Sequence, residues 1–380
     1  MRFYRDVSKA PSRIFLLRSG DIFRNLAFET CLYLDSDRFK LATDEVAPPT
    51  DILLWKSDPC VVIGRFQSPW KECNVNLLRE RRWPLARRQS GGGAVFHDQN
   101  NLNISFVEAR SVLDRRKCME FLKATLQPLK PDTCVHVGDR YDLWISGPSC
   151  ESNKATWKKI SGSSSRLGDK VAYHHCTLLC NADLHNLSEV LSPSFETLQT
   201  QATSSVRSPV VNLGIDVAQM ETVMVEGARE WLSERRRTHT SDTLVLQVFP
   251  GDEPNFVDPT KFDQILSGFR AWSWIWGSSP AFHLDLSEFL PSPSPIGHLL
   301  LHCKRGGVVQ SLEFCSNVVA LQGFVNALSN ALAGSEIRTS SWHGLLDLFY
   351  AQWQFEHSKQ PWLEEQDLIL RALRIFSDRI

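Results

Sequence analysis

Three consecutive glycines, Gly91 to Gly93, stand between segments that favour β structure. Residues Ala94 to Phe96 and Ile104 to Phe106 are of strand-forming types. The stretch from Arg87 to Phe106 therefore predicts a strand, a glycine loop and a return into strand. Because glycine lacks a Cβ, such a loop admits positive φ and lets the backbone approach a ligand closely.

The residues around this loop favour an anion site. Arg87 and Arg88 precede it, while His97 and Asp98 follow it. Loop N–H groups form a cradle for anionic oxygens, and an arginine beside it adds a fork that fits carboxylate or phosphate. The alternative is a tight hairpin with solvated arginines. The loop is neither a Walker loop, because Lys-Ser/Thr does not follow, nor GxGxxG.

A second polar stretch runs from Lys158 to Arg166. Adjacent residues of a strand point to opposite faces, so one of Lys158 and Lys159 is expected in solvent and the other in a pocket. A lysine taken out of water needs an anionic partner, or its pKa falls. The small residues Ser161 to Ser165 leave room for a ligand beside it. The alternative is two solvated lysines before a flexible turn.

The segment from His174 to Cys180 contains two histidines and two cysteines, which are possible zinc ligands. No second ligand cluster lies at zinc-finger spacing, so a packed strand is favoured over a metal site. The 10 cysteines of the chain are scattered without a CxxC pair. This pattern favours reduced thiols in an intracellular compartment over a disulfide framework.

Length and composition exclude several classes of protein. At 380 residues and 42% hydrophobic content, two packed domains are expected. A net charge of −1 provides no field that recruits nucleic acid or acidic membranes, and no apolar run reaches the roughly 18 residues that span a bilayer. Residues Met1 to Ser19 are rich in arginine and poor in acid, as in a mitochondrial transit segment, although Arg13 to Leu17 also fits a first strand.

Hydrophobic periodicity predicts the elements along the chain. Strands are expected at 14–17, 52–55, 60–63, 141–146, 174–180, 299–302 and 308–314. The strands at 52–55 and 60–63 are expected to pair around a turn at 57–59. Helices are expected at 21–34, 74–82, 114–126, 216–237, 318–332 and 363–376, and irregular segments at 64–70, 150–156, 204–213 and 291–295.

A break at Pro250 to Pro254 is interpreted as a linker. It divides the chain into a larger domain, residues 1–249, and a linker with a small C-terminal α+β domain, residues 250–380.

Together, six segments resemble the lipoate–protein ligase A and lipoyltransferase family. They are VVIGRFQSPWKECN from Val61, RRQSGGGAVFHD from Arg87, KISGSSSR from Lys159, HHCTLLCNADL from His174, SVRSPVVNL from Ser205 and WSWIWGSSPAF from Trp272. They follow the family's order over most of the chain, and their combination is specific where each alone is not. The resemblance implies a large α/β catalytic domain on a mixed β-sheet, related to biotin protein ligases, and a small C-terminal α+β domain.

The resemblance also implies a reaction. A lipoyl group is attached, through lipoyl-adenylate, to a lysine of a carrier domain, either a lipoyl domain of a 2-oxoacid dehydrogenase E2 subunit or the glycine cleavage H protein. Joining the carboxylate to AMP creates a good leaving group, and the acceptor lysine attacks as a neutral amine. The implied small molecules are lipoate and lipoyl-AMP, with ATP and Mg²⁺ if activation is retained. A monomer is expected in mitochondria, with the cytoplasm as the alternative, and without a metal bound by protein alone.

By motif match, Lys159 is the essential lysine, expected to bridge the acyl carbonyl and the phosphate. The matching adenylate-binding positions are Arg88, Gly91, Gly92, Gly93, Ala94, Val95, Phe96, His97, Asp98, Asn101, Asp142, Ser161 and Gly162. No protein nucleophile is required, so neither Cys176 nor Cys180 is expected to act as one. One mild departure is Asn100, which stands where the family commonly has glycine.

The sequence leaves three hypotheses about the function open. The chain activates lipoate with ATP and transfers it, or it only transfers a lipoyl group already activated or bound to another protein. The third reading is a non-catalytic assembly factor that binds lipoyl domains. A biotin ligase is disfavoured because the GRGRxxG loop is absent, and an octanoyl transferase because its glycine motif is absent.

Overall fold

The computed structural model describes residues 10–39, 48–147, 157–237, 239–291, 297–315, 321–337, 339–358 and 363–379. These residues form two compact units. Unit 1 comprises residues 1–65, 86–188 and 206–270, and unit 2 comprises 66–85, 189–205 and 271–380. The predicted irregular segment at 150–156 and most of the predicted turn at 291–295 lie outside the described residues.

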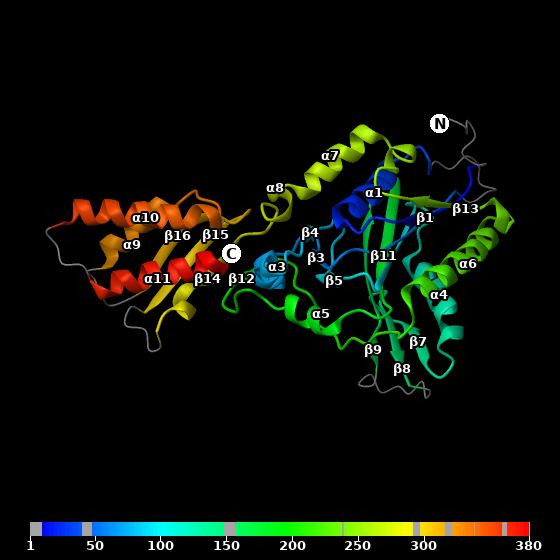
Figure 1. Ribbon diagram of the computed structural model, residues 1–380, viewed down its shortest axis with the longest axis horizontal. Helices are drawn as coiled ribbons and strands as arrows, with labels where there is room; N and C mark the ends of the chain where they lie inside the picture. Colours follow the sequence, from blue (N-terminus) through cyan, green and yellow to red (C-terminus); the bar gives the residue numbers. More distant parts are fainter. Residues whose placement is uncertain are drawn as a thin grey trace. The chain divides into compact units, whose positions relative to one another are not determined.

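Unit 1 is built on a six-stranded mixed sheet with the order β10-β11-β6-β2-β1-β13 (Figure 1). Strand β1 is parallel to both of its neighbours, and the other neighbouring pairs are antiparallel. The strands are β1 (Arg13–Leu17), β2 (Asp51–Trp55), β6 (Asn101–Ala109), β10 (Ser161–Leu167), β11 (Val171–Leu179) and β13 (Leu244–Val248). The predicted α/β class with a mixed sheet is confirmed.

The two faces of this sheet have different coverings. Ile14 and Leu16 of β1 lie in one apolar cluster with side chains of α4 (Arg115–Leu126) and α6 (Val217–Arg236). Between them in sequence, Phe15 makes an edge-to-face contact with Phe28 of α1 (Ile22–Leu34), with ring centroids 5.2 Å apart. Because strand side chains alternate between faces, α1 covers the face opposite to α4 and α6.

A separate three-stranded sheet carries the glycine loop. It has the order β4-β3-β5, from β3 (Cys60–Ile63), β4 (Leu85–Arg87) and β5 (Val95–His97). The predicted strand, loop and strand are therefore confirmed, but the predicted pairing of 52–55 with 60–63 is wrong. Strand β2 pairs with β1 and β6 instead, because the intervening turn carries the chain from one sheet to the other.

A third small sheet in unit 1 presents the second polar stretch. It consists of β7 (Cys134–Val137), β8 (Leu143–Ser146) and β9 (Lys158–Lys159). Lys159 lies opposite Trp144 in β8, and its own N–H donates to the carbonyl of Pro209 at 2.8 Å. The segment at 204–213 is irregular, as predicted, and is joined to β9 by this contact.

The segment interpreted as a linker lies within unit 1. Glu253, in the short 3-10 helix Glu253–Asn255, is 3% exposed, and its carboxylate accepts from Arg24 of α1 at 2.6 and 2.8 Å. Helix α7 (Pro259–Arg270) follows and packs against α1 (Figure 1). The boundary between the two compact units near this segment thus lies between Arg270 and Ala271. The domain boundary predicted between residues 249 and 250 stays a prediction.

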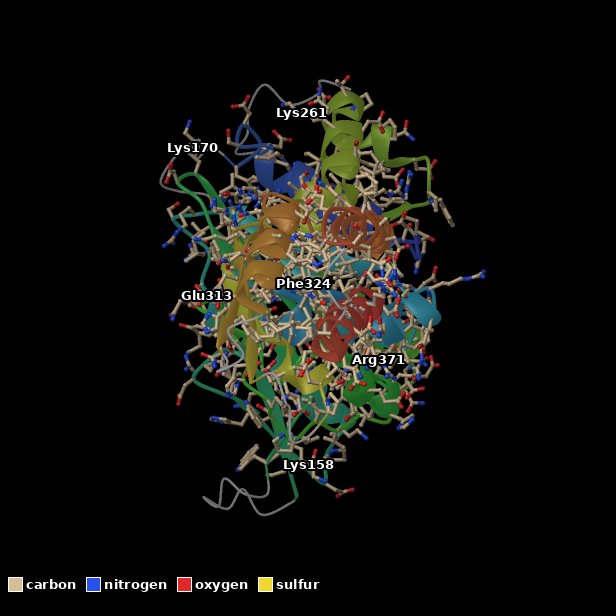
Figure 2. The ribbon with its side chains drawn as sticks, turned by 90° about the vertical axis from the view of Figure 1, so that its left-hand side faces the viewer. Lys158, Lys170, Lys261, Glu313, Phe324 and Arg371 are labelled. Atoms are coloured by element: carbon tan, nitrogen blue, oxygen red, sulfur yellow. The ribbon has the colours of Figure 1, made fainter. Side chains whose placement is uncertain are left out.

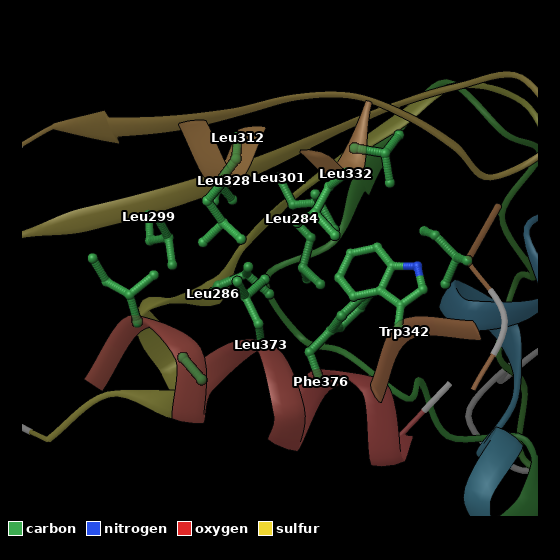
Figure 3. Packing of buried hydrophobic residues seen from close by; sticks show 14 of the residues in the cluster. Leu284, Leu286, Leu299, Leu301, Leu312, Leu328, Leu332, Trp342, Leu373 and Phe376 are labelled. Atoms are coloured by element: carbon green, nitrogen blue, oxygen red, sulfur yellow. The ribbon is translucent and has the colours of Figure 1, made fainter. Parts of the chain in front are cut away.

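Unit 2 contains a four-stranded sheet, β12-β14-β15-β16. Its strands are β12 (Gln199–Thr200), β14 (Phe282–Asp285), β15 (His298–Lys304) and β16 (Val308–Cys315), with β15 and β16 antiparallel as predicted. Figure 3 shows apolar side chains filling the space between these strands and α11 (Glu364–Arg379). The other helices of this unit are α2 (Pro69–Glu72), α3 (Val75–Glu80), α8 (Trp272–Ile275), α9 (Gln322–Leu332) and α10 (Thr339–Glu356), and α5 (Leu184–Val190) crosses from unit 1.

Helix α10 was not predicted. Its apolar residues do not form one stripe, because Leu348 and Phe355 are 66% and 83% exposed while Trp342 and Leu346 are buried. The predicted helices at 21–34, 74–82, 114–126, 216–237 and 363–376 are confirmed within a few residues. Helix α9 confirms the described part of the helix expected at 318–332.

Three further findings bear on protein class. In the described ranges, no helix is long and apolar enough to cross a membrane, and no group of three or more His, Cys, Asp and Glu side chains is placed to hold a metal ion. Seven of the described cysteines are free and buried. Cys134 takes part in a disulfide bond, so the expectation of reduced thiols fails at that position.

Candidate active site

The candidate lysine is held by an ion pair. Lys159 Nζ lies 2.8 Å from Asp142 Oδ2, and the two side chains are 20% and 8% exposed. Asp142 directly precedes β8, and its Oδ1 accepts the backbone N–H of Ser163 at 3.0 Å. The neighbouring Lys158 is exposed (Figure 2). One lysine thus lies in solvent and the other pairs with an anion, while the pocket expected beside Lys159 stays a prediction.

The ammonium of Lys159 lies close to the strand that leaves the glycine loop. A Cβ on Gly162 would lie 3.8 Å from Lys159 Nζ and 3.9 Å from Val95 Cγ1. The amine and Val95 therefore flank the same glycine. Both distances are those of ordinary van der Waals contact, so Lys159 and Val95 lie directly beside Gly162.

Arg88 holds the glycine loop itself. Its side chain is 5% exposed, and Nη2 donates to the carbonyls of Gly91 and Gly93 at 2.6 and 2.7 Å. Nη1 donates to the carbonyl of Val62 at 3.1 Å, and Nε to Ser90 Oγ at 3.0 Å. Burial lowers the pKa of this guanidinium to about 10, which still keeps it charged near neutral pH.

These contacts orient the loop amides. In a planar trans peptide, a carbonyl and the N–H of the next residue point in opposite directions. With the carbonyls of Gly91 and Gly93 turned toward Arg88, the N–H groups of Gly92 and Ala94 point away from it. Gly92 has φ of +82°, where a side chain would be strained. Arg88 therefore supports the loop from within, and the anion-binding cradle stays a prediction.

One face of β10 lines this loop. Ser164 Oγ donates to the carbonyl of Gly91 at 2.7 Å, and Arg166 lies two residues further on the same face. The Arg166 guanidinium stacks 4.4 Å from the Tyr33 ring centre, and its Nη1 is buried with no hydrogen-bond partner among the described residues. A buried cationic donor without a partner is suited to an anionic ligand.

Arg166 was not named as a candidate site residue, although it ends the KISGSSSR segment. The period-two spacing from Gly162 through Ser164 would have identified it. The same periodicity places Ser161, which was predicted to bind the ligand, on the other face. Ser161 is fully buried opposite Leu178, a residue of the apolar cluster under α4 and α6.

His97, which ends β5, and the residues after it are engaged within the fold. His97 Nε2 lies 3.2 Å from Thr177 Oγ1. Asp98 accepts the N–H groups of Asn100 and Asp183, both at 2.8 Å, and Asn101 Nδ2 donates to the carbonyl of Phe96 at 2.9 Å. These side chains shape the turn that follows the loop. Asn100 does not have a positive φ, so glycine is not needed there.

The thiols on β11 and just after it are not set up as nucleophiles. Burial raises the pKa of Cys176 and of Cys180 to about 12 each. The reactive form of cysteine is the thiolate, which is scarce near neutral pH at such a pKa. The segment is a packed strand, as predicted. The described residues therefore offer the amine of Lys159, guanidinium groups and loop amides, which are groups of the kind that stabilise negative charge.

The chain is similar in sequence to known proteins. The sequence profile of the lipoyl protein ligase A/B catalytic domain matches residues 21–230. Mitochondrial lipoyl amidotransferase LIPT1 of Mus musculus is 33% identical over 275 residues, which make up 72% of this chain and 67% of the mouse protein. For the Homo sapiens protein the values are 34% over 271 residues, 71% and 66%. The match thus spans about two thirds of these relatives.

Solved structures share the fold. The crystal structure of Plasmodium falciparum LipL1 in complex with lipoate has a TM-score of 0.53 at 18% identity, covering 96% of this chain and 99% of that one. A bipartite lipoate protein ligase from Thermoplasma acidophilum, solved in a study with its E2 lipoyl domain, has a TM-score of 0.51 at 20% identity, covering 70% and 96%. The sequence profile covers more than half of the chain, and the two mammalian relatives share about a third of the aligned residues. The chain therefore belongs to the lipoyl protein ligase A/B family, as the resemblance in its sequence predicted.

Proposed function

We propose that this chain is a lipoyltransferase that moves a lipoyl group from lipoyl-adenylate to a lysine of a carrier domain. The observation that supports this most directly is the Lys159–Asp142 ion pair beside the glycine loop. A fixed ammonium next to a cradle of amides suits a mixed anhydride, which carries an acyl carbonyl and a phosphate side by side.

Each group has a role in this proposal. Lys159 contacts the bridging region of the anhydride and stabilises charge as the acceptor amine attacks. The loop amides and the buried Nη1 of Arg166 bind the phosphate or acyl oxygens. Asp142 keeps the ammonium in place, and Arg88 keeps the loop in shape. AMP then leaves with the electrons of the broken acyl–oxygen bond.

The relatives support the choice of acceptor and compartment. Two of them are named mitochondrial lipoyl amidotransferases, and the archaeal ligase was studied with an E2 lipoyl domain. We assign lipoyl domains of 2-oxoacid dehydrogenases and the glycine cleavage H protein as acceptors, a monomer as the working form, and mitochondria as the location. If the activation step is retained, ATP with Mg²⁺ is the further small-molecule requirement of this proposal.

The two adjacent lysines provide a matched test. Purified Lys159→Ala and Lys158→Ala variants are incubated with lipoyl-adenylate and an apo lipoyl domain, and the mass of the domain is followed. Lys159→Ala is expected to lose more than about 100-fold in rate because it removes a group that stabilises charge in the transition state. Lys158→Ala, at an exposed position, is expected to match the parent. Full activity of Lys159→Ala would show that Lys159 is not the essential lysine, and no modification of the domain by the parent protein would support the non-catalytic assembly factor.

A second candidate function differs in the donor. The name of the mammalian relatives favours transfer from a lipoylated protein, by exchange of one lysine amide for another. The same assay distinguishes the donors when it is supplied with lipoate and ATP, with lipoyl-adenylate, or with a lipoylated H protein. Modification with lipoate and ATP demonstrates activation, modification with lipoyl-adenylate but not with lipoate and ATP demonstrates transfer from the adenylate, and modification with lipoylated H protein demonstrates the amide exchange.

A further inference from the structure

A chain of buried polar side chains runs from α1 to the glycine loop. Glu29 of α1 is 1% exposed, and its Oε1 lies 2.9 Å from His175 Nδ1. His175 Nε2 lies 2.8 Å from Ser90 Oγ, and Ser90 accepts from Arg88 Nε at 3.0 Å. Arg88 then contacts the carbonyls of the loop, as described above. Side chains from three parts of the sequence are thus linked end to end.

The hydrogen atoms in this series of hydrogen bonds can be assigned consistently. With Glu29 ionised, Nδ1–H of a neutral His175 donates to the carboxylate, so Nε2 is an acceptor. Ser90 then donates its hydroxyl to Nε2 and uses a lone pair to accept from Arg88. Glu29 Oε1 also accepts from Ser105 Oγ at 2.5 Å. Each member therefore fixes the orientation of the next.

The order serine, histidine and carboxylate is also that of a nucleophilic triad, but burial argues against that role. Ser90 is 1% exposed, and its oxygen already accepts from Arg88. A nucleophilic hydroxyl must reach the acyl carbon and be free of such a donor. Ser90 is instead placed to hold the Arg88 guanidinium, whose other nitrogens grip the loop.

We propose that Glu29, His175 and Ser90 are positioning residues, which set the geometry of the glycine loop through Arg88. This inference rests on the proposed lipoyl transfer. Arg88 alone has rotatable bonds that permit other placements, and Ser90 anchored to His175 limits them. Misplacing a group by about 1 Å in a reacting complex costs about 100-fold in rate. The four side chains thus connect helix α1 and strand β11 to catalysis without touching substrate.

Strand β11 provides a matched control. His174 is adjacent to His175 and 1% exposed, but neither of its ring nitrogens hydrogen-bonds to another side chain among the described residues. Replacing either histidine with phenylalanine removes a buried imidazole from the same strand. Only His175→Phe breaks the row of hydrogen bonds that leads from Glu29 to the glycine loop. Any shared loss of stability is thereby separated from an effect on the loop.

Full-length His175→Phe and His174→Phe are compared at pH 8, first by thermal unfolding and then by transfer from lipoyl-adenylate. His175→Phe is expected to lose about 100-fold in kcat, with little change in KM for the acceptor domain. His174→Phe is expected to keep the parental kcat. Hydrogen exchange at the amides from Gly91 to Ala94, which needs no activity, is expected to accelerate only in His175→Phe. An equal kcat in both variants, or unchanged exchange in His175→Phe, would overturn the proposal.

Ser90 variants supply a second arm if His175→Phe does not fold. Ser90→Ala removes the link and is expected to behave as His175→Phe does, whereas Ser90→Thr retains a hydroxyl and is expected to recover at least part of the lost kcat. Mass spectrometry of the protein during turnover tests the triad reading. A lipoyl ester on Ser90 would replace the positioning role with a nucleophilic one. If the parent itself transfers no lipoyl group, the proposed function fails, while hydrogen exchange still reports on the link.

Discussion

At the scale of single residues, burial decides what the two arginines before the glycine loop do. Arg87 is fully buried and donates to the carbonyls of Gly64 and Arg65 at 3.2 and 3.0 Å. Arg88 binds the loop carbonyls from within. The hairpin with solvated arginines is therefore wrong. Charged donors that replace water with backbone carbonyls make the loop rigid, and their cost of burial is offset by these hydrogen bonds.

Two glycines near the loop are expected to respond differently to alanine. A Cβ at Gly64 would lie 2.2 Å from the carbonyl oxygen of Gly92, so the loop must move, whereas a Cβ at Gly91 would meet nothing within 4 Å. Gly64→Ala is expected to lower the free energy of unfolding by about 1–3 kcal/mol and to reduce lipoyl transfer. Gly91→Ala is expected to fold as the parent does. Urea titration with a transfer assay checks both, and equal stability of the two variants would contradict this account.

At the scale of elements, β10 and β11 divide polar from apolar surroundings. On β11, His175 and Thr177 face the loop side, where they contact Ser90 and His97, while Cys176 and Leu178 belong to the cluster under α4 and α6. Both faces are buried, so the alternation is one of chemistry and not of exposure. A shift of one residue in register would exchange the two sets and destroy both the site and the core.

The pairing of β1 with β2 contains a buried ion pair that is expected to be essential to the fold. Asp51 is fully buried and accepts from Arg13 at 2.9 Å and from Arg38 at 2.6 Å. Burial alone would raise its pKa, but the two guanidinium groups outweigh burial and lower it. Asp51→Asn leaves both arginines without their counter-charge, and a loss of about 3 kcal/mol in unfolding free energy is expected.

The control for this prediction is Asp114→Asn, because Asp114 caps α4 at an exposed position and asparagine caps equally well. Its unfolding free energy is expected to stay within about 0.5 kcal/mol of the parent in guanidinium titrations. Similar losses in the two variants would show that the ion pair is not what stabilises this part of the sheet.

At the scale of the molecule, each unit is built from segments that are distant in sequence. The core of unit 2 combines Trp70 and Phe195 with residues from the C-terminal half. Among the latter are Leu284 and Phe376 (Figure 3). Unit 1 likewise joins β1 to β13 across more than two hundred residues. A cut at the predicted boundary would therefore remove parts of both cores, so the division of function between the domains is better tested with whole-chain variants.

The stability of unit 1 is expected to depend on pH through two buried histidines. Burial, aided by nearby positive charge, lowers the pKa of His97 and of His174 to about 3 each. In the unfolded chain a histidine has a pKa near 6.5. The unfolded state therefore takes up protons below about pH 6.5 that the folded state refuses. This stabilisation is complete above that pH and is lost progressively as the pH falls toward 3.

Each histidine is expected to contribute a slope of up to about 1.4 kcal/mol per pH unit in the window between pH 6 and 5. Urea titrations at pH 7, 6 and 5 measure the slope for the parent and for His174→Phe. His174→Phe is expected to lose the part of the slope that His174 contributes and to keep the part that His97 contributes. An identical slope in the two proteins would mean that His174 is accessible to protons in the folded state.

The local character of the chain was predictable from its sequence. The glycine loop between strands, the amphipathic helices such as 114–126 and the unequal environments of Lys158 and Lys159 depend on periodicity and on the conformational freedom of glycine, which are properties of short segments. The family also follows from sequence, because several short motifs occur together in order. Helix α10 was not predicted, because its buried face is defined by the residues that pack against it and not by an apolar stripe in its sequence.

Only the tertiary structure decided which side chains meet. That Arg88 supports the loop from within, that Arg166 has a buried donor without a partner, and that Glu29 reaches Ser90 through His175 all depend on contacts between distant segments. Local preference leaves strand pairing open, and for this reason the strand at 60–63 was assigned to the wrong partner. The energy that selects one pairing comes from burial and hydrogen bonds across the whole unit, which no short segment contains.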